Sequence, residues 1–80
     1  MPTIARIRGY RFYFYSHEPN EPPHVHVDRD RLSAKFWLEP TGLARNLGFN
    51  ARELTILERL VEDNRKEFLE KWHGYFGTSR

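Results

Sequence analysis

The sequence predicts one α+β domain, in which an antiparallel sheet of three or four strands packs one face against a single long C-terminal helix. Two observations lead to this prediction. In the first half of the chain, apolar and polar residues alternate in short segments that Gly and Pro separate, which is typical of half-buried strands. In the second half, apolar residues recur at helical spacing over residues 51–73. The 80 residues, 39% of them apolar, suffice for one core and are too few for two domains.

The composition favours a cytoplasmic protein. The chain has no cysteine, so it forms no disulfide, and any bound metal would have to be held by His, Asp or Glu. It has no apolar run of about 18 residues and no apolar segment typical of a signal peptide, so we expect neither membrane insertion nor export. The formal charge of +2 permits contact with nucleic acid without requiring it.

The first two strands are predicted at residues 3–8 and 10–16. Both segments are rich in Ile, Phe and Tyr, which favour strands, and Gly9 between them marks a break. Because side chains alternate between the two faces of a strand, Phe12 and Phe14 should point into the core. Their neighbours should then lie on the opposite face.

The third strand is predicted at residues 24–29, after a proline-rich turn that cannot supply ladder amides. We expect an antiparallel pairing with the preceding strand that sets Phe14 opposite Val27 and Arg11 opposite Asp30. This register places apolar side chains together on the core face and a cation beside an anion on the other face.

A further strand is predicted at residues 32–38, where apolar residues again alternate. The link over residues 28–31 has no Gly, so we expect a four-residue loop in place of a two-residue turn. In this hairpin Lys35 should lie opposite His26. Residues 43–47 form either a short edge strand or a loop that covers the core.

One helix is predicted from about residue 51 to about residue 73. Asn50 is a favourable N-cap, Glu53 stands where a capping box needs it, and Gly74 offers a left-handed C-cap. At about 1.5 Å per residue such a helix is about 35 Å long, whereas strands of about five to seven residues span only about 17 to 24 Å. The helix should therefore extend beyond the sheet.

The apolar end of this helix predicts an interface. Its large side chains would have too little sheet beneath them, and such an end usually packs against another subunit or a partner. We therefore expect a homo-oligomer or a partner protein at the side chains of Phe68, Leu69, Trp72, Tyr75 and Phe76.

The sheet face that points away from the core carries the candidate site. By alternation this face collects histidines, aromatic residues and charged residues, namely Arg11, Tyr13, Tyr15, His17, His24, His26, Asp28, Lys35 and Trp37. These residue types support three functions, and a further interpretation is that cross-strand aromatic pairs only stabilise the sheet.

The first two functions use the histidines. His24 and His26 point the same way on one strand. His17 or Asp28 could complete with them a set of ligands for a divalent transition metal such as Zn, Mn or Fe. Alternatively, His24 and His26 could act as general base and general acid of a metal-free nuclease, with Lys35 or Arg11 stabilising negative charge.

The third function is binding. The face combines aromatic residues with cations, namely Arg11, Tyr13, Tyr15, Lys35 and Trp37. This composition is typical of protein-binding hot spots and also of sheets that hold single-stranded nucleic acid. Between these two ligands, the sequence favours a protein partner.

The chain resembles a small bacterial family known as domain of unknown function 4160. The motifs that carry the resemblance are FYFYS at residues 12–16, PPHVHV at 22–27, AKFWL at 34–38 and WHGYF at 72–76, and the similarity extends over nearly the whole chain. The resemblance implies a second small protein encoded nearby, in gene pairs that look like toxin-antitoxin modules.

Together, these observations predict a component of a two-protein module. It would bind its partner, and nucleic acid as a further ligand, through the aromatic and basic sheet face or through the helix end. The alternative is a small histidine-dependent nuclease or metalloenzyme that uses His17, His24 and His26.

Overall fold

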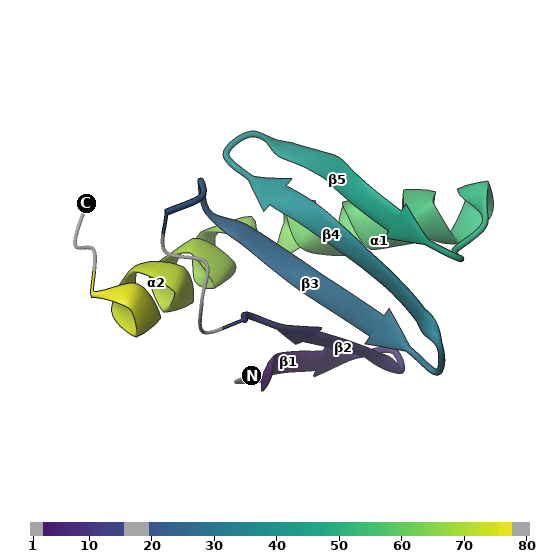
Figure 1. The fold of residues 1–80 in the computed structure, drawn as a ribbon, viewed down its shortest axis with the longest axis horizontal. Coiled ribbons are helices and arrows are strands. Elements are labelled where there is room, and N and C mark those ends of the chain that lie inside the picture. The colour runs from purple at the N-terminus through teal and green to yellow at the C-terminus, as the bar shows by residue number, and fades with distance from the viewer. Residues whose placement is uncertain (1–2, 16–19, 78–80) are drawn as a thin grey trace.

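Five antiparallel strands follow one another in sequence order and form one meander sheet (Figure 1). The structure is a computed structural model and describes residues 3–15 and 20–77. The strands are β1 (Thr3–Ile7), β2 (Tyr10–Tyr13), β3 (His24–Arg29), β4 (Leu32–Leu38) and β5 (Thr41–Leu47). The helices α1 (Ala51–Asp63) and α2 (Arg65–Phe76) follow them. The α+β class is confirmed, with five strands and two helices in place of three or four strands and one helix.

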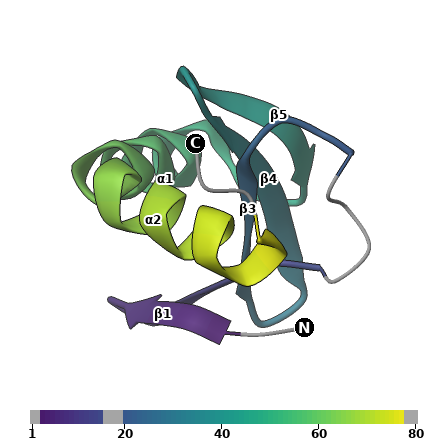
Figure 2. The same cartoon turned by 90° about the vertical axis from the view of Figure 1, so that its left-hand side faces the viewer.

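Both helices lie on the same side of the sheet (Figure 2). The opposite face of β3, β4 and β5 is turned away from them, and we call it the outer face. Neither helix in the described part of the chain combines the length and the apolar character that crossing a bilayer requires.

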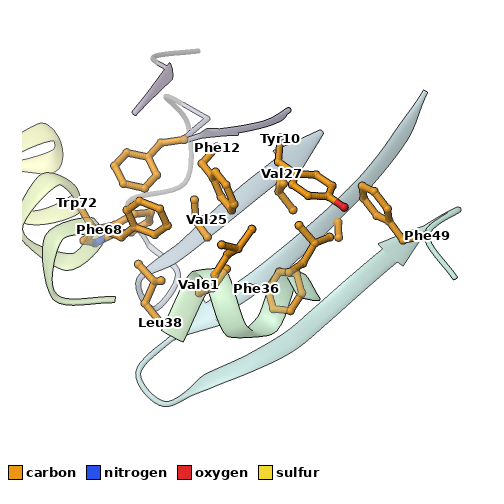
Figure 3. Close-up of a cluster of buried hydrophobic side chains, with 14 residues drawn as sticks. Tyr10, Phe12, Val25, Val27, Phe36, Leu38, Phe49, Val61, Phe68 and Trp72 are labelled. Atoms are coloured by element: carbon orange, nitrogen blue, oxygen red, sulfur yellow. The ribbon is translucent and has the colours of Figure 1, made fainter. Parts of the chain in front are cut away.

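The core fills the space between the sheet and the helices (Figure 3). Phe12 and Phe36 from the sheet and Val61 from α1 have no exposed surface. Phe14, which follows β2, is equally buried, so the prediction that Phe12 and Phe14 point inward is confirmed. Burial of side chains of this size contributes about 1.5 to 3 kcal/mol each to stability.

The register between β2 and β3 differs from the prediction by two residues. Val27 lies opposite Phe12 and not Phe14, and Arg11 lies opposite Asp28 and not Asp30. A shift of two residues keeps every side chain on its own face, which is why the predicted faces are correct although the predicted pairs are wrong.

The turn between β3 and β4 is tighter than predicted, although the pairs between these two strands are the predicted ones. Arg29 pairs with Leu32, so Asp30 and Arg31 form a two-residue turn and not the predicted four-residue loop. Asp30 has a φ of 56°, in the left-handed region that Asp tolerates better than most residues. Asp30 thus takes the place that Gly often has in such turns, and it is not available to pair with β2.

The segment after β4 forms a full edge strand. The prediction left residues 43–47 open between a strand and a loop, and β5 begins earlier, at Thr41. Its pairing with β4 sets Arg45 opposite Lys35 and Leu47 opposite Ser33. This pairing brings residues of β5 to the outer face.

The helical segment is interrupted at Asn64. The Asn64 side chain donates to the carbonyl oxygen of Leu60 at 2.8 Å, and Asn64 adopts φ −108° and ψ 11°. Asn side chains that bond to nearby backbone compete with helix geometry, which accounts for a break that apolar periodicity did not predict. The second helix also ends later than predicted, because Gly77, with a φ of 74°, is the left-handed C-cap and not Gly74.

The end of α2 is covered to a large extent by the chain itself. Phe68 is 0% and Trp72 3% exposed. The Phe68 ring packs on Phe12 at 5.3 Å between centroids, and the Trp72 ring packs on Phe14 at 5.3 Å. The expectation that these two side chains lack cover is therefore wrong, because the residues at the end of β2 reach beneath α2. Tyr75 is 45% exposed, and Leu69 and Phe76 are half-buried.

Candidate functional site

A row of polar side chains crosses the outer face from β2 to β5. Tyr13 lies opposite His26, His26 opposite Lys35, and Lys35 opposite Arg45. Side chains directly opposite each other on antiparallel strands are close enough to interact, so these four residues form one continuous polar row. The predicted pair of His26 and Lys35 is confirmed.

Tyr13 is the buried end of this row, with 2% of its surface exposed. Its hydroxyl donates to Oδ1 of Asp28 at 3.0 Å, its ring stacks on His26, and the Arg11 guanidinium lies 4.5 Å from the ring centroid. Burial raises the pKa of the Tyr13 phenol, and hydrogen bonds to Tyr15 and Asp28 raise it further. Tyr13 is therefore a neutral, structural member of the site.

His24 has no exposed surface. Its Nδ1 lies 2.9 Å from the carbonyl oxygen of Pro22, and because a carbonyl only accepts, Nδ1 donates this hydrogen bond. The His24 ring contacts Trp72 and Trp37, with centroids 4.9 and 5.8 Å away. His24 thus links the Pro22-Pro23 turn to α2.

His26 is 8% exposed and lies in the middle of the row. Its ring stacks against Tyr13 with 5.4 Å between centroids and meets the edge of Tyr15 at 4.4 Å. The remaining exposed edge of His26 borders a pocket. Of the two predicted catalytic histidines, only His26 reaches solvent.

The pocket lies over β3, β4 and β5 and has a volume of about 130 Å³. The side chains that line it include Tyr15, His26, Ser33, Lys35, Arg45 and Leu47. The Lys35 ammonium donates to Oε1 of Glu21 at 2.6 Å and lies 4.8 Å from the Trp37 ring centroid. The sequence analysis missed Ser33, Arg45, Leu47 and Glu21 as members of the site. The grouping of the first three residues depends on the register between β4 and β5. That register could not be predicted, because residues 43–47 were left open between a strand and a loop.

Of the predicted metal ligands, His24 and His26 lie side by side, with 5.1 Å between their ring centroids. His17 lies outside the described residues, and Asp28 accepts the hydrogen bond of Tyr13. In the parts of the chain that the structure describes, no three His, Asp or Glu side chains are arranged to hold a metal ion.

A second polar cluster lies on the helix side and fixes α1 to the sheet. Glu53 accepts a hydrogen bond from the Tyr10 hydroxyl at 3.0 Å and forms an ion pair with Arg29. Burial raises the pKa of Tyr10, and the hydrogen bond to Glu53 adds to the shift. Asn50 is the N-cap as predicted, since its Oδ1 accepts from the Glu53 N–H at 2.8 Å. The Glu53 carboxylate itself is bound to the sheet, so this cluster is structural.

Comparison with known proteins identifies the family. No curated protein and no solved structure matches the chain. A family model described as Domain of unknown function (DUF4160) matches residues 9–73, which include the outer face, the pocket and most of both helices. The chain therefore belongs to the family of the domain of unknown function 4160.

Proposed function

We propose that the protein is the binding component of a two-protein module and holds a small partner protein through the outer face. The observation that carries this proposal is the exposed aromatic and apolar surface on a sheet face turned away from both helices. Tyr15 is 38% and Leu47 55% exposed, and the half-buried Trp37 lies on the same face. Large exposed apolar side chains grouped in this way mark interaction surfaces.

The charges around this surface favour an acidic partner. Arg11 and Lys35 flank the aromatic rings, and Arg45 lies exposed at the edge strand. Tyr, Trp and Arg are the residue types that dominate binding hot spots, whereas cations at the rim mainly steer association. The absence of cysteine suits a module that acts in a reducing cytoplasm.

The geometry supports binding better than a histidine-dependent nuclease. A general base must come within hydrogen-bonding distance of its substrate, and His24 has no exposed surface through which a substrate could reach it. His26 alone borders the pocket, so the predicted pair of histidines does not supply a base and an acid to one substrate.

The test is the affinity for the protein encoded by the neighbouring gene, measured by calorimetry on purified proteins. Trp37→Ala and Tyr15→Ala should each weaken binding by about 30-fold or more if they are hot-spot residues, which corresponds to about 2 kcal/mol. Tyr75→Ala is the matched control, because Tyr75 is a similarly exposed aromatic residue at the end of α2.

Two results would contradict the proposal. In the first, Trp37→Ala and Tyr15→Ala bind the neighbouring protein as tightly as the wild type does, whereas Tyr75→Ala binds it weakly. That result would place the interface at the helix end. In the second, the protein binds single-stranded oligonucleotides through this face and no protein partner. Unfolding curves of each variant establish that a loss of binding is not a loss of fold.

A further inference from the structure

The pocket on the outer face has the features of an anion site. We propose that it binds the phosphate group of a small phosphate monoester, with Lys35 and Arg45 as the charged ligands and Ser33 as a hydroxyl donor. This inference rests on the pocket and its charges and is independent of the partner protein proposed above. Three observations carry it.

The first observation is the pairing of two cations. Lys35 and Arg45 lie directly opposite each other on β4 and β5. Like charges in this position destabilise a sheet, and an anion that contacts both side chains would offset their repulsion. His26, the other cross-strand neighbour of Lys35, is more than nine-tenths buried and presents its remaining edge to the same pocket.

The second observation is an internal carboxylate at the pocket. Glu21 Oε1 lies 2.6 Å from the Lys35 ammonium, and the Glu21 side chain is 43% exposed. Glu21 precedes the Pro22-Pro23 turn and belongs to no strand, so it can move without breaking a ladder hydrogen bond. Glu21 therefore competes with an incoming anion for the Lys35 ammonium.

The third observation concerns the size and the walls of the pocket. Its volume of about 130 Å³ accommodates one phosphate group and a small part of the attached molecule. Tyr15 and Leu47 provide exposed apolar walls for that part. Asp28 lies opposite Ser33, so its carboxylate limits the negative charge that this side of the pocket tolerates. The small volume and this carboxylate favour a single phosphate group over the successive phosphates of a nucleic-acid strand.

The experiment is a titration of the folded, isotope-labelled full chain with inorganic phosphate and with a nucleoside monophosphate at constant ionic strength. Amide chemical shifts of Ser33, Lys35, Arg45 and Leu47 should change and saturate. Arg45→Gln should weaken binding about tenfold or more, because a charge-assisted contact is lost. Glu21→Gln should strengthen binding, since the internal competitor loses its charge.

Lys66→Gln is the matched control, because it removes the same charge from an exposed position on α2 and should leave the affinity unchanged. The proposal would be overturned by shifts that grow linearly without saturation, by equal shifts in wild type and Arg45→Gln, or by Glu21→Gln binding more weakly. It would equally be overturned if a single-stranded oligonucleotide without a terminal phosphate saturated these residues while neither inorganic phosphate nor the nucleoside monophosphate did. The Arg45→Gln spectrum itself reports whether that variant is folded.

Discussion

At the outer face, side chains that alternation alone would expose are buried by one another. Tyr13 is 2% and His26 8% exposed, although both point away from the core. Arg11, Tyr15 and Asp28 surround them through ring contacts and the Tyr13 hydrogen bond. The sheet thus has a small second layer of packing, and the residues that remain accessible for binding are fewer than the sequence pattern implies.

Tyr13 should make the protein sensitive to alkaline pH. The pKa of Tyr13 is raised in the folded protein, whereas in the unfolded chain it is near about 10. Below that pH the Tyr13 phenol is protonated in both the folded and the unfolded protein, and its full contribution to the free energy of unfolding is present. Above that pH the unfolded chain loses its proton first, so the free energy of unfolding should fall by up to about 1.4 kcal/mol per pH unit.

Urea denaturation between about pH 9 and about pH 11.5 measures this effect. Tyr13→Phe should cost about 1 kcal/mol at neutral pH, because the hydrogen bond to Asp28 is lost. The same variant should lose less stability than the wild type as the pH rises. Tyr75→Phe, at an exposed tyrosine, should follow the wild type. Parallel declines in wild type and Tyr13→Phe would show that Tyr13 does not carry the alkaline sensitivity.

The sequence predicted which residues share a face and how His26 and Lys35 pair between β3 and β4, but not the pairs between β2 and β3. Strict alternation predicted that Phe12 and Phe14 point inward, because a period of two is a property of any strand. The partner of Arg11 was wrong, since a register shifted by two residues keeps every side chain on its own face and alternation does not distinguish the two registers. The contact between Lys35 and Glu21 joins a strand to a turn and follows from no periodicity.

At the scale of the elements, the connection from β5 to α1 depends on one glycine. Gly48 follows β5 and has a φ of 107°, and a Cβ atom there would lie 2.7 Å from Cδ2 of Leu32. Only Gly adopts this backbone conformation at little cost. The turn sends the chain from the edge strand to the N-cap at Asn50, and so it fixes both β5 and the start of α1.

Gly48→Ala should therefore destabilise the protein by about 1 to 3 kcal/mol, through backbone strain and through the contact with Leu32. Gly42→Ala, within β5, is the matched control, because a Cβ there meets nothing within 4 Å. It should change the free energy of unfolding by about 0.5 kcal/mol or less. Equal unfolding midpoints of the two variants in urea would disprove the role of Gly48.

In the helices, the sequence predicted the N-terminal cap correctly but not the break. The cap at Asn50 was predicted correctly because it rests on a local pattern with a direct physical cause. The break at Asn64 was missed, since the apolar repeat continues across it and only the bond to the Leu60 carbonyl reveals it. Beyond the break, Arg65 donates to the carbonyl oxygen of Leu38 at 2.6 Å and so ties the start of α2 to the end of β4.

At the scale of the whole molecule, the protein has a closed side and an open side. On the closed side, α1 and α2 cover the core, and the side chains of Phe68 and Trp72 are buried in it (Figure 3). On the open side, Tyr15, Trp37 and Leu47 remain available beside the phosphate pocket proposed above. The sequence predicted both candidate surfaces. Tertiary packing distinguishes them, because it buries Phe68 and Trp72 at the helix end and leaves the three outer-face side chains named above at least partly exposed.

The most direct measurement of the central claim is hydroxyl-radical footprinting of the complex with the neighbouring gene product. Tyr15 and Tyr75 are suited to comparison, because they are the same residue type and are 38% and 45% exposed on different parts of the molecule. The partner should protect Tyr15 and Trp37 from oxidation and leave Tyr75 as reactive as in the free protein. Protection of Tyr75 with unchanged reactivity of Tyr15 and Trp37 would contradict it.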